Sequence, residues 1–457
     1  MNNIHMKRRK FLKTTSLATA GIIAAPYVLP SGRIFAKSGS QLAQHVVYVL
    51  FAGGVRQQES VLQRYLKDSQ GLTFEGNILL NILDGLQPGP NDKRVYGTDP
   101  PPPGTPGSIP IPQILSQTLQ AQGTLFPEVY FSKSGTGHYN GLTTVTSGSY
   151  GTNGLRNRPP YPTIYEYVRR HLGLPATKVW FIGNGIGNST QLLNYSDHPD
   201  YGSDYGANFI APSIIFGDLG DEHLRNAKVY HPEEELGPVY EMKGFLDAVY
   251  QARTGTLPGI HNTEDEKNDI KEFMRAMFQK KDAGQIALPP VSDTGELQIT
   301  GYACEVMKWF KPALTVINFN SIDGCHASFT GYLRAMHRCD HAVGHLWNFI
   351  QTQIPEMAGS TAIIVTPEHG RSLAPNPILD ENDWRAFDHN SDHNARRMFS
   401  LMAGPGIQAN LRIGTETNPV GDATDCVPTI AEILGIKNEV TGAGFLDSDA
   451  ASLFDRI

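Results

Sequence analysis

Residues 45–51 read HVVYVLF, a continuous apolar run rich in β-branched side chains. Such a run is typical of a strand that is covered on both faces, as strands of a parallel sheet are. It ends just before Gly53 and Gly54, which break the pattern. Comparable runs follow along the chain, and we predict a strand at each: 127–132, 177–183, 313–319, 360–366 and 398–404.

Helical patterns alternate with these strands. We predict helices at 56–67, 140–148, 162–173, 328–353 and 425–435, and three more in the middle of the chain at 237–252, 263–281 and 296–310. Strands that alternate with long helices predict an α/β fold, with a mostly parallel central sheet and helices on both faces. In such sheets, functional residues gather beyond the carboxyl ends of the strands.

Composition bounds the class of protein. The 457 residues carry a net charge of −7, so the chain lacks the basic surface of a nucleic-acid-binding protein, and we expect no nucleic acid among its partners. We predict one α/β domain over 37–457, with a Pro-rich excursion at 86–112 and a helical insertion at about 236–310. Four cysteines are too few for a disulfide framework; Cys325 and Cys339 either pair or stay free.

The N-terminus has the layout of an export signal. A basic start at 7–10 precedes a weakly apolar stretch at 14–29 and small residues near Ala36, which predicts a signal peptide over 1–36. Arg8 and Arg9 resemble a twin-arginine signal, so we expect the twin-arginine translocase as a partner during export. The expected location is periplasmic or secreted. No later segment is apolar enough to suggest a stable membrane span.

Polar side chains collect at three of the predicted strand ends. Asp323 and His326 follow the strand at 313–319, and Glu368 and His369 follow the strand at 360–366. His389 and His393 stand ahead of the strand at 398–404. Imidazole and carboxylate groups without paired cysteines suit a divalent metal, most readily zinc, with manganese or iron as alternatives.

Some polar residues near these strand ends could have a purely structural role. Asp388 and His389 could serve a turn, and Asp392 could cap a helix that begins near His393. His337, His341 and His345 are four residues apart on one predicted helix, a spacing that could present a metal-binding face. Because Asp340 lies among them on a strongly periodic helix, we predict a solvated helix face there instead.

The order of these motifs resembles that of the alkaline phosphatase superfamily, which includes sulfatases, nucleotide phosphodiesterases and cofactor-independent phosphoglycerate mutases. The resemblance covers most of the chain after the signal peptide. It begins with the strand that leads into Gly53-Gly54 and continues through TGHYNGLTTVTSGSYG (136–151), Asp323 with His326, VTPEHGR (365–371), His393 with AGPGI (403–407), and DCVPTIAEILG (425–435).

The resemblance implies two metal ions held side by side and the hydrolysis of phosphate or sulfate esters. It assigns Asp323, His326 and His393 to one metal ion, and Glu368 and His369 to the other. The distance to Gly404 favours His393 over His389 as the final ligand. Two cations beside the esterified oxygens would stabilise an in-line displacement.

The chain departs from the family pattern in three places. Ala52 stands where the opening strand of the family ends in a metal-binding Asp, and Glu59 is the nearest acid downstream. The usual Asp-His pair is Glu368-His369. The nucleophile is left open between Ser134, Thr136 and His138, which different ways of aligning the motif select. The Cys-x-Pro-x-Arg signature of formylglycine sulfatases is absent.

Two functions follow. The first is an exported metal-dependent hydrolase of phosphate or sulfate esters, acting on a small-molecule or polymer-borne substrate. The second is a degenerate member of the superfamily that binds a metal or ligand, or supports an extracellular complex, without turnover. Ala52 and the unclear nucleophile favour the second function, and the retained ligands favour the first. A complete second metal site would separate them.

Overall fold

The computed structural model describes residues 40–64, 76–86, 110–153, 158–184, 193–223, 225, 260–291, 295–390 and 392–457. The predicted signal peptide and the predicted helix at 237–252 lie outside these ranges, and so does most of the excursion at 86–112. The division into one domain over 37–457 stays a prediction.

The described residues form one eight-stranded sheet with the order β4-β3-β5-β1-β6-β7-β2-β8. β4, β3, β5, β1 and β6 are mutually parallel, whereas β7 runs antiparallel to both β6 and β2. The strands are β1 (His45–Phe51), β2 (Gly123–Tyr130), β3 (Val179–Gly183), β4 (Asn208–Ile210), β5 (Leu314–Phe319), β6 (Thr361–Pro367), β7 (Arg397–Ala403) and β8 (Leu411–Arg412).

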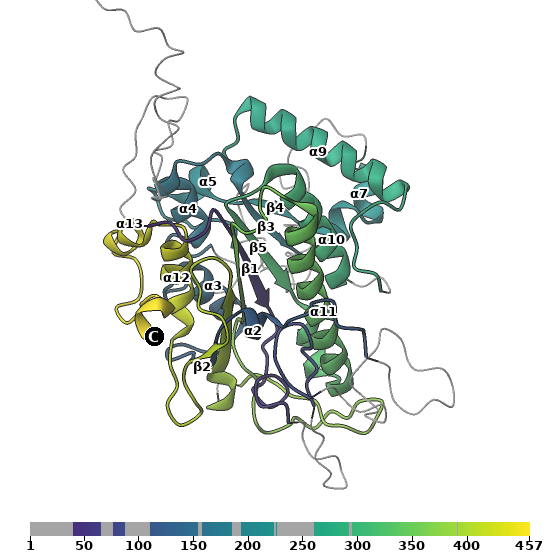
Figure 1. The fold of residues 1–457 in the computed structure, drawn as a ribbon, viewed down its shortest axis with the longest axis vertical. Coiled ribbons are helices and arrows are strands. Elements are labelled where there is room, and N and C mark those ends of the chain that lie inside the picture. The colour runs from purple at the N-terminus through teal and green to yellow at the C-terminus, as the bar shows by residue number, and fades with distance from the viewer. Residues whose placement is uncertain are drawn as a thin grey trace, which may run out of the picture.

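Helices cover both faces of this sheet (Figure 1). One side holds α3 (His138–Ser147), α4 (Ile164–Leu172) and α12 (Cys426–Ile433), and the other holds α10 (Gly295–Phe310) and α11 (Phe329–Gln353). The remaining helices are α2 (Leu119–Gln122), α5 (Gly202–Tyr205), α6 (Pro212–Ile215), α7 (Asp218–His223), α9 (Glu264–Asp282) and α13 (Lys437–Gly442). Short 3-10 segments are η1 (Ala176–Lys178), η3 (Ser321–His326), η4 (Asn394–Arg396), η5 (Ala423–Asp425) and η6 (Leu453–Arg456). The predicted fold class is confirmed: a mostly parallel sheet between helices.

β1 lies at the centre of the core. All seven of its residues are buried, and it pairs with β5 on one side and β6 on the other. Burial on both faces explains why its sequence is continuously apolar instead of alternating. Each buried valine or leucine there contributes about 1.5–3 kcal/mol relative to an exposed one.

Most of the predicted elements are present, and the helix at 162–173 shows why. Thr163 and Glu166 form a capping box at the start of α4, and Gly173 ends the helix in a left-handed conformation with φ of 62°. Both signals are local, so they can be read from the sequence.

The helix predicted at 56–67 is wrong over its described part, because residues 57–62 form turns. Arg56 and Glu59 are both buried and form an ion pair with each other. The side chain of Gln57 donates to the backbone oxygens of Pro127 and Met398, each at 2.7 Å. Tertiary hydrogen bonds to β2 and β7 therefore replace helical ones in this segment.

The prediction of a solvated face on α11 is also wrong. His337, Asp340 and His341 are buried, because the segments 76–86 and 110–115 cover this face. His337 bonds to the oxygen of Ile78 through Nδ1 and accepts from the N–H of Ile111 at Nε2, both at 2.8 Å. Asp340 accepts from the backbone N–H groups of Asn81 and Ile82.

The described residues also include all four cysteines and the helices that could be considered for a membrane span. All four cysteines are buried and free, so Cys325 and Cys339 do not pair. Among the described helices, none combines the length and the apolar character that crossing a membrane requires.

Candidate metal centre

The topology brings five chain segments to one edge of the sheet. β5, β1 and β6 are adjacent and parallel, so their carboxyl ends, at Phe319, Phe51 and Pro367, lie side by side. β7 runs the other way, so the loop that leads into its start at Arg397 reaches the same edge. β2 ends beside that start, and the chain then passes through residues 131–137 to the beginning of α3. Residues far apart in sequence can therefore meet here.

Gly53 and Gly54 let the backbone pass between the residues of this edge. Their φ values of +105° and +80° are unfavourable for other residues. A Cβ on Gly53 would lie 2.3 Å from the backbone nitrogen of Asp323, and one on Gly54 would lie 2.4 Å from Nδ1 of His369. The close approach lets the N–H of Gly53 donate to Oε1 of Glu368 at 2.5 Å.

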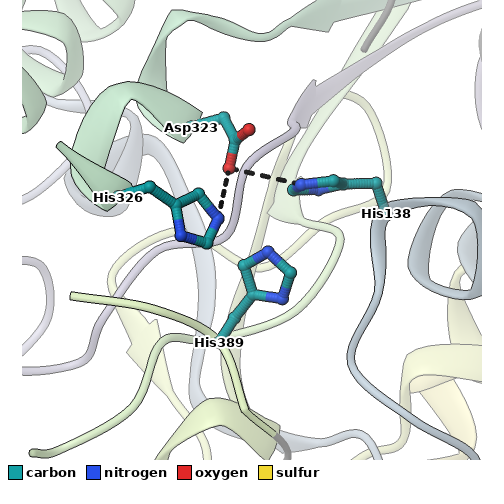
Figure 2. A group of neighbouring side chains, drawn as sticks. All are labelled: His138, Asp323, His326 and His389. Atoms are coloured by element: carbon teal, nitrogen blue, oxygen red, sulfur yellow. Dashed lines mark ion pairs between the residues drawn. The ribbon is translucent and has the colours of Figure 1, made fainter. Parts of the chain in front are cut away.

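The first group of candidate ligands consists of Asp323, His326, His138 and His389, and Figure 2 shows these side chains pointing toward one another. Each offers one ligand atom, and these atoms all lie within 4.8 Å of one another. Oδ1 of Asp323 is 3.2 Å from Nε2 of His326 and 3.3 Å from Nε2 of His138. The ring of His389 lies 4.6 Å from that of His138 and 4.8 Å from that of His326, measured between centroids.

The second group consists of His138, Glu368 and His369. Nδ1 of His138 lies 2.7 Å from Oε1 of Glu368, and Nε2 of His369 lies 3.4 Å from the same oxygen. Glu368 and His369 are completely buried. His138 thus belongs to both groups, with one ring nitrogen facing each.

Three polar atoms of these two groups are buried and have no hydrogen-bond partner among the described residues: Oε2 of Glu368, Nε2 of His369 and Nε2 of His389. A buried polar atom without a partner costs about 1–3 kcal/mol, and native structures leave few of them. Here they occur next to one another, beside two carboxylates. The donor set of imidazole nitrogens and carboxylate oxygens fits a divalent transition metal.

Neighbouring groups orient the candidate ligands. Oδ1 of Asp388 lies 2.6 Å from Nδ1 of His326, so Nε2 of that ring turns toward Asp323. Arg371 is buried and donates to Oδ1 of Asp323 at 2.7 Å and to the oxygen of Phe387 at 2.7 Å. Such hydrogen bonds hold ligand side chains in one orientation, and they commonly surround metal sites. His369 is oriented in the same way, with Nδ1 2.7 Å from the oxygen of Gly370.

The carboxylates and burial shift the pKa values of the four imidazoles in opposite directions. Burial alone would lower the pKa of His138, but the charge of Glu368 and hydrogen bonds to Asp323 and Glu368 outweigh it and raise this pKa to about 10. The hydrogen bond to Asp323 raises the pKa of His326. Burial lowers the pKa of His369 and lowers that of His389 to about 4, and nearby charged groups add to both effects.

The same contacts act on Asp323. Burial would raise its pKa, but hydrogen bonds from His138 and His326, together with the charge of Arg371, lower it. Asp323 is therefore ionised at neutral pH, as a metal ligand must be.

The structure places the other predicted site residues around these groups. His393 is not brought to either group; its Nδ1 lies 3.1 Å from the hydroxyl of Tyr130. Ser134 is exposed and has a φ of 68°. Thr136 is buried and its hydroxyl donates to the backbone oxygen of His389 at 2.8 Å. Glu59 pairs with Arg56, so it does not replace the acid that is absent at Ala52.

The sequence patterns do not settle the roles of three residues of this centre. Spacing to Gly404 favours His393 over His389, yet it is His389 that lies among the clustered ligands. A turn is enough to account for Asp388, although an acid directly before a candidate ligand is a signal for an orienting partner. Arg371 closes the stretch VTPEHGR, but its contact with Asp323 depends on tertiary structure and leaves no local signal.

No protein-family model matches the chain, and no curated protein matches it. Solved structures do show similarity. One is a protein of the alkaline phosphatase superfamily from Vibrio parahaemolyticus, with 12% identity and a TM-score of 0.38 over 94% of this chain and 76% of that one.

Two other similar structures are a variant of the alkaline phosphatase PafA and a 2-O glycosaminoglycan sulfatase. The first has 10% identity and a TM-score of 0.45 over 92% of this chain and 100% of that one. The second has 11% identity and a TM-score of 0.38 over 86% and 71%. At these identities and TM-scores no substrate, metal or residue role passes to this chain.

Proposed function

We propose that the chain is a metal-dependent hydrolase of phosphate or sulfate esters. The observation that carries this proposal is the set of unpartnered buried atoms on Glu368, His369 and His389, which lie beside Asp323 and His138. Folding penalises such atoms unless another group completes their bonding. A divalent cation would satisfy nitrogen and oxygen atoms at once, whereas a buried water would need hydrogen-bond donors and acceptors in a particular arrangement.

The residues that would hold the metal are those of the two groups: Asp323, His326, His389 and His138 on one side, and Glu368 and His369 with His138 on the other. Zinc fits this mixture of imidazole and carboxylate best, and manganese and iron are the alternatives. A bound divalent cation would act as a Lewis acid on the oxygens of a phosphoryl or sulfuryl group.

The chain's own residues prepare this chemistry by fixing the donors. Hydrogen bonds from His138 and His326, together with the charge of Arg371, keep Asp323 ionised. Arg371 also donates to Oδ1 of Asp323, and Asp388 turns Nε2 of His326 toward the same carboxylate. The contact from Nδ1 of His369 to the oxygen of Gly370 requires the proton on Nδ1, which leaves Nε2 with its lone pair available. The imidazole nitrogens of His326 and His369 therefore face the centre before any metal arrives.

A second function is favoured by a specific observation. Ala52 offers no ligand, and the hydroxyl of Thr136, the buried candidate for the nucleophile, is engaged with the backbone oxygen of His389 instead of being free to attack. A protein that binds metal or a ligand without turnover, or that supports an extracellular complex, would need neither. We retain hydrolysis as the proposal because the centre has two carboxylates, Asp323 after β5 and Glu368 after β6.

Turnover separates the two functions. The purified chain, stripped of metal and reloaded with zinc, manganese or iron, is assayed with 4-nitrophenyl phosphate and 4-nitrophenyl sulfate. Hydrolysis should require the metal and should be lost in Asp323→Asn, which keeps the shape of the side chain and removes its charge. Metal binding without hydrolysis of either ester, or of larger polymer-borne esters, would support the second function. Hydrolysis that survives in Asp323→Asn would contradict the proposal.

We also propose that the protein is exported to the periplasm or beyond by the twin-arginine translocase, with a mature chain that begins near Lys37. The support is the arrangement of Arg8 and Arg9 ahead of Phe11 and Leu12. The double variant Arg8→Lys/Arg9→Lys keeps the charge and should accumulate uncleaved in the cytoplasm. Normal export of this variant would contradict the twin-arginine assignment and leave a general secretory signal.

A further inference from the structure

We propose that His138 is a bridging ligand, whose two ring nitrogens hold two divalent cations in one coupled site. The inference rests on the metal site of the proposed function and adds how its two halves are joined. The sequence left His138 as one of three candidates for the nucleophile. In this inference its imidazole is instead a permanent ligand of the metal centre.

The contacts of the ring point in this direction. Nε2 of His138 lies 3.3 Å from Oδ1 of Asp323, and Nδ1 lies 2.7 Å from Oε1 of Glu368. The two carboxylates follow different strands, β5 and β6, which are separated in the sheet by β1. The imidazole therefore lies between side chains that follow the strands on either side of β1.

Each ring nitrogen of His138 faces a donor set of its own. Nε2 lies beside Asp323, which is grouped with His326 and His389, and Nδ1 lies beside Glu368, which is grouped with His369. A neutral imidazole has one N–H, so it can satisfy only one of two carboxylates. A ring between two carboxylates must either carry two protons or hold cations in their place. The unpartnered nitrogens of His369 and His389, one in each set, favour cations.

The ring is held firmly enough to serve as a bridge. His138 is the first residue of α3, and its ring lies against those of His389 and His369, at 4.6 Å and 5.4 Å between centroids. The hydroxyls near it in sequence do not take its position. Thr136 donates to the backbone of His389, and Ser134 is exposed. The side chain between the two carboxylates is therefore the imidazole of His138, with one ring nitrogen facing each carboxylate.

Copper provides a direct test, because two Cu²⁺ ions that share one imidazole are magnetically coupled. Metal-free protein is titrated with Cu²⁺, and the electron paramagnetic resonance signal is integrated against the copper bound. We expect two coppers per chain with a signal well below that of two isolated ions. In His138→Ala the coupling should disappear, and the affinity for the second ion should fall more than about 100-fold, beyond the usual cost of losing an orienting residue.

His393→Ala is the matched control, since it removes an imidazole outside both groups and should keep two coupled ions. Saturation of the wild type at one copper, two ions with full uncoupled signal, or coupling that persists in His138→Ala would each overturn the bridge. If His138→Ala does not fold, the stoichiometry and signal of the wild type still decide. One metal per chain together with metal-dependent ester hydrolysis would overturn the bridge and leave the proposed function standing.

Discussion

Among the described residues, histidines gather in two places, on α11 and at the carboxyl edge of the sheet, and the two sets differ in what faces them. On α11, His337 bonds to two backbone groups, and Nε2 of His345 lies 3.0 Å from the oxygen of Ala287. At the sheet edge, His138 and His326 face the carboxylate of Asp323, and His369 and His389 each keep an unpartnered nitrogen. Backbone groups thus complete His337 and His345, whereas the sheet-edge histidines face carboxylates and one another. His341, between them on α11, also has buried ring nitrogens without a hydrogen-bond partner, but among the described residues it belongs to no group of candidate ligands.

The difference comes from how the residues are placed in the fold. Histidines four apart on a helix form a row, so each meets a different part of the segments that cover it. Those segments supply backbone oxygens and N–H groups to His337 and His345 one at a time. The ends of neighbouring strands instead bring side chains from distant segments to the same two carboxylates. Burial alone therefore does not identify a metal site, and the kind of partner does.

The strongest test of this contrast exchanges one acid in each region. Asp323→Asn removes the charge that His138, His326 and Arg371 share, and we expect metal affinity to fall more than about 100-fold. Asp340→Asn removes a buried acid that accepts from Asn81 and Ile82, and it should leave metal affinity unchanged while lowering stability. Isothermal titration with zinc and thermal unfolding measure both quantities.

The contrasting outcome is that Asp340→Asn weakens metal binding as much as Asp323→Asn does. That outcome would place the metal on α11 and would contradict the assignment of the site to the sheet edge.

His337→Ala should have the next largest effect, on stability alone. The substitution leaves the oxygen of Ile78 and the N–H of Ile111 without their partner and opens a cavity, which together cost about 2–4 kcal/mol. Denaturant unfolding measures this change, and elemental analysis should find the metal content of the wild type. Loss of metal with full stability would reverse the roles that we assign to the two sets.

The α11 set should also make stability depend on pH. Burial lowers the pKa of His337 to about 4, against the raising effect of its bond to Ile78. An unfolded histidine titrates near pH 6.5, so between about 6.5 and 4 the unfolded chain binds a proton that the folded chain does not. Stability should therefore fall as the pH decreases through this window, by up to about 3 kcal/mol. Metal-free wild type and His337→Ala are compared by unfolding at several pH values, and equal slopes would refute this source.

The smallest expected effect is that of Ala52→Asp. The register of β1 and β6 continues from Phe51 and Pro367 to place Ala52 beside Glu368, whose Oε1 already accepts from Gly53. A second carboxylate there should destabilise the metal-free protein by about 1–2 kcal/mol through repulsion, and zinc should remove the difference. Ala52→Asn provides the same bulk without the charge. Equal melting temperatures of the two metal-free variants would show that position 52 does not face Glu368.

Much of the fold could be predicted because its signals are local. The apolar run of β1 and the capping box at Thr163 need no knowledge of the rest of the chain. The segment after Gly54 could not be predicted, because hydrogen bonds from Gln57 to β2 and β7 replace helical ones. The antiparallel direction of β7 also leaves no mark in its sequence.

The candidate site, too, was predictable only where local sequence signals place its residues. Asp323, His326, Glu368 and His369 directly follow strands, so the fold class was enough to bring them together. The choice between His389 and His393 depends on how the loop before β7 runs, which spacing does not fix. The position of His138 between two carboxylates depends on where β2 delivers the start of α3, and this is a property of the whole sheet.

Metal content tests the central claim most directly. Wild type, His389→Ala and His393→Ala are purified, exchanged into zinc at equal concentration, desalted and analysed for metal per chain. The structure predicts at least one tightly held zinc in the wild type and in His393→Ala, and loss of most of it in His389→Ala. A wild type that retains no metal, or a His393→Ala variant that loses zinc while His389→Ala keeps it, would contradict a metal centre at this edge of the sheet.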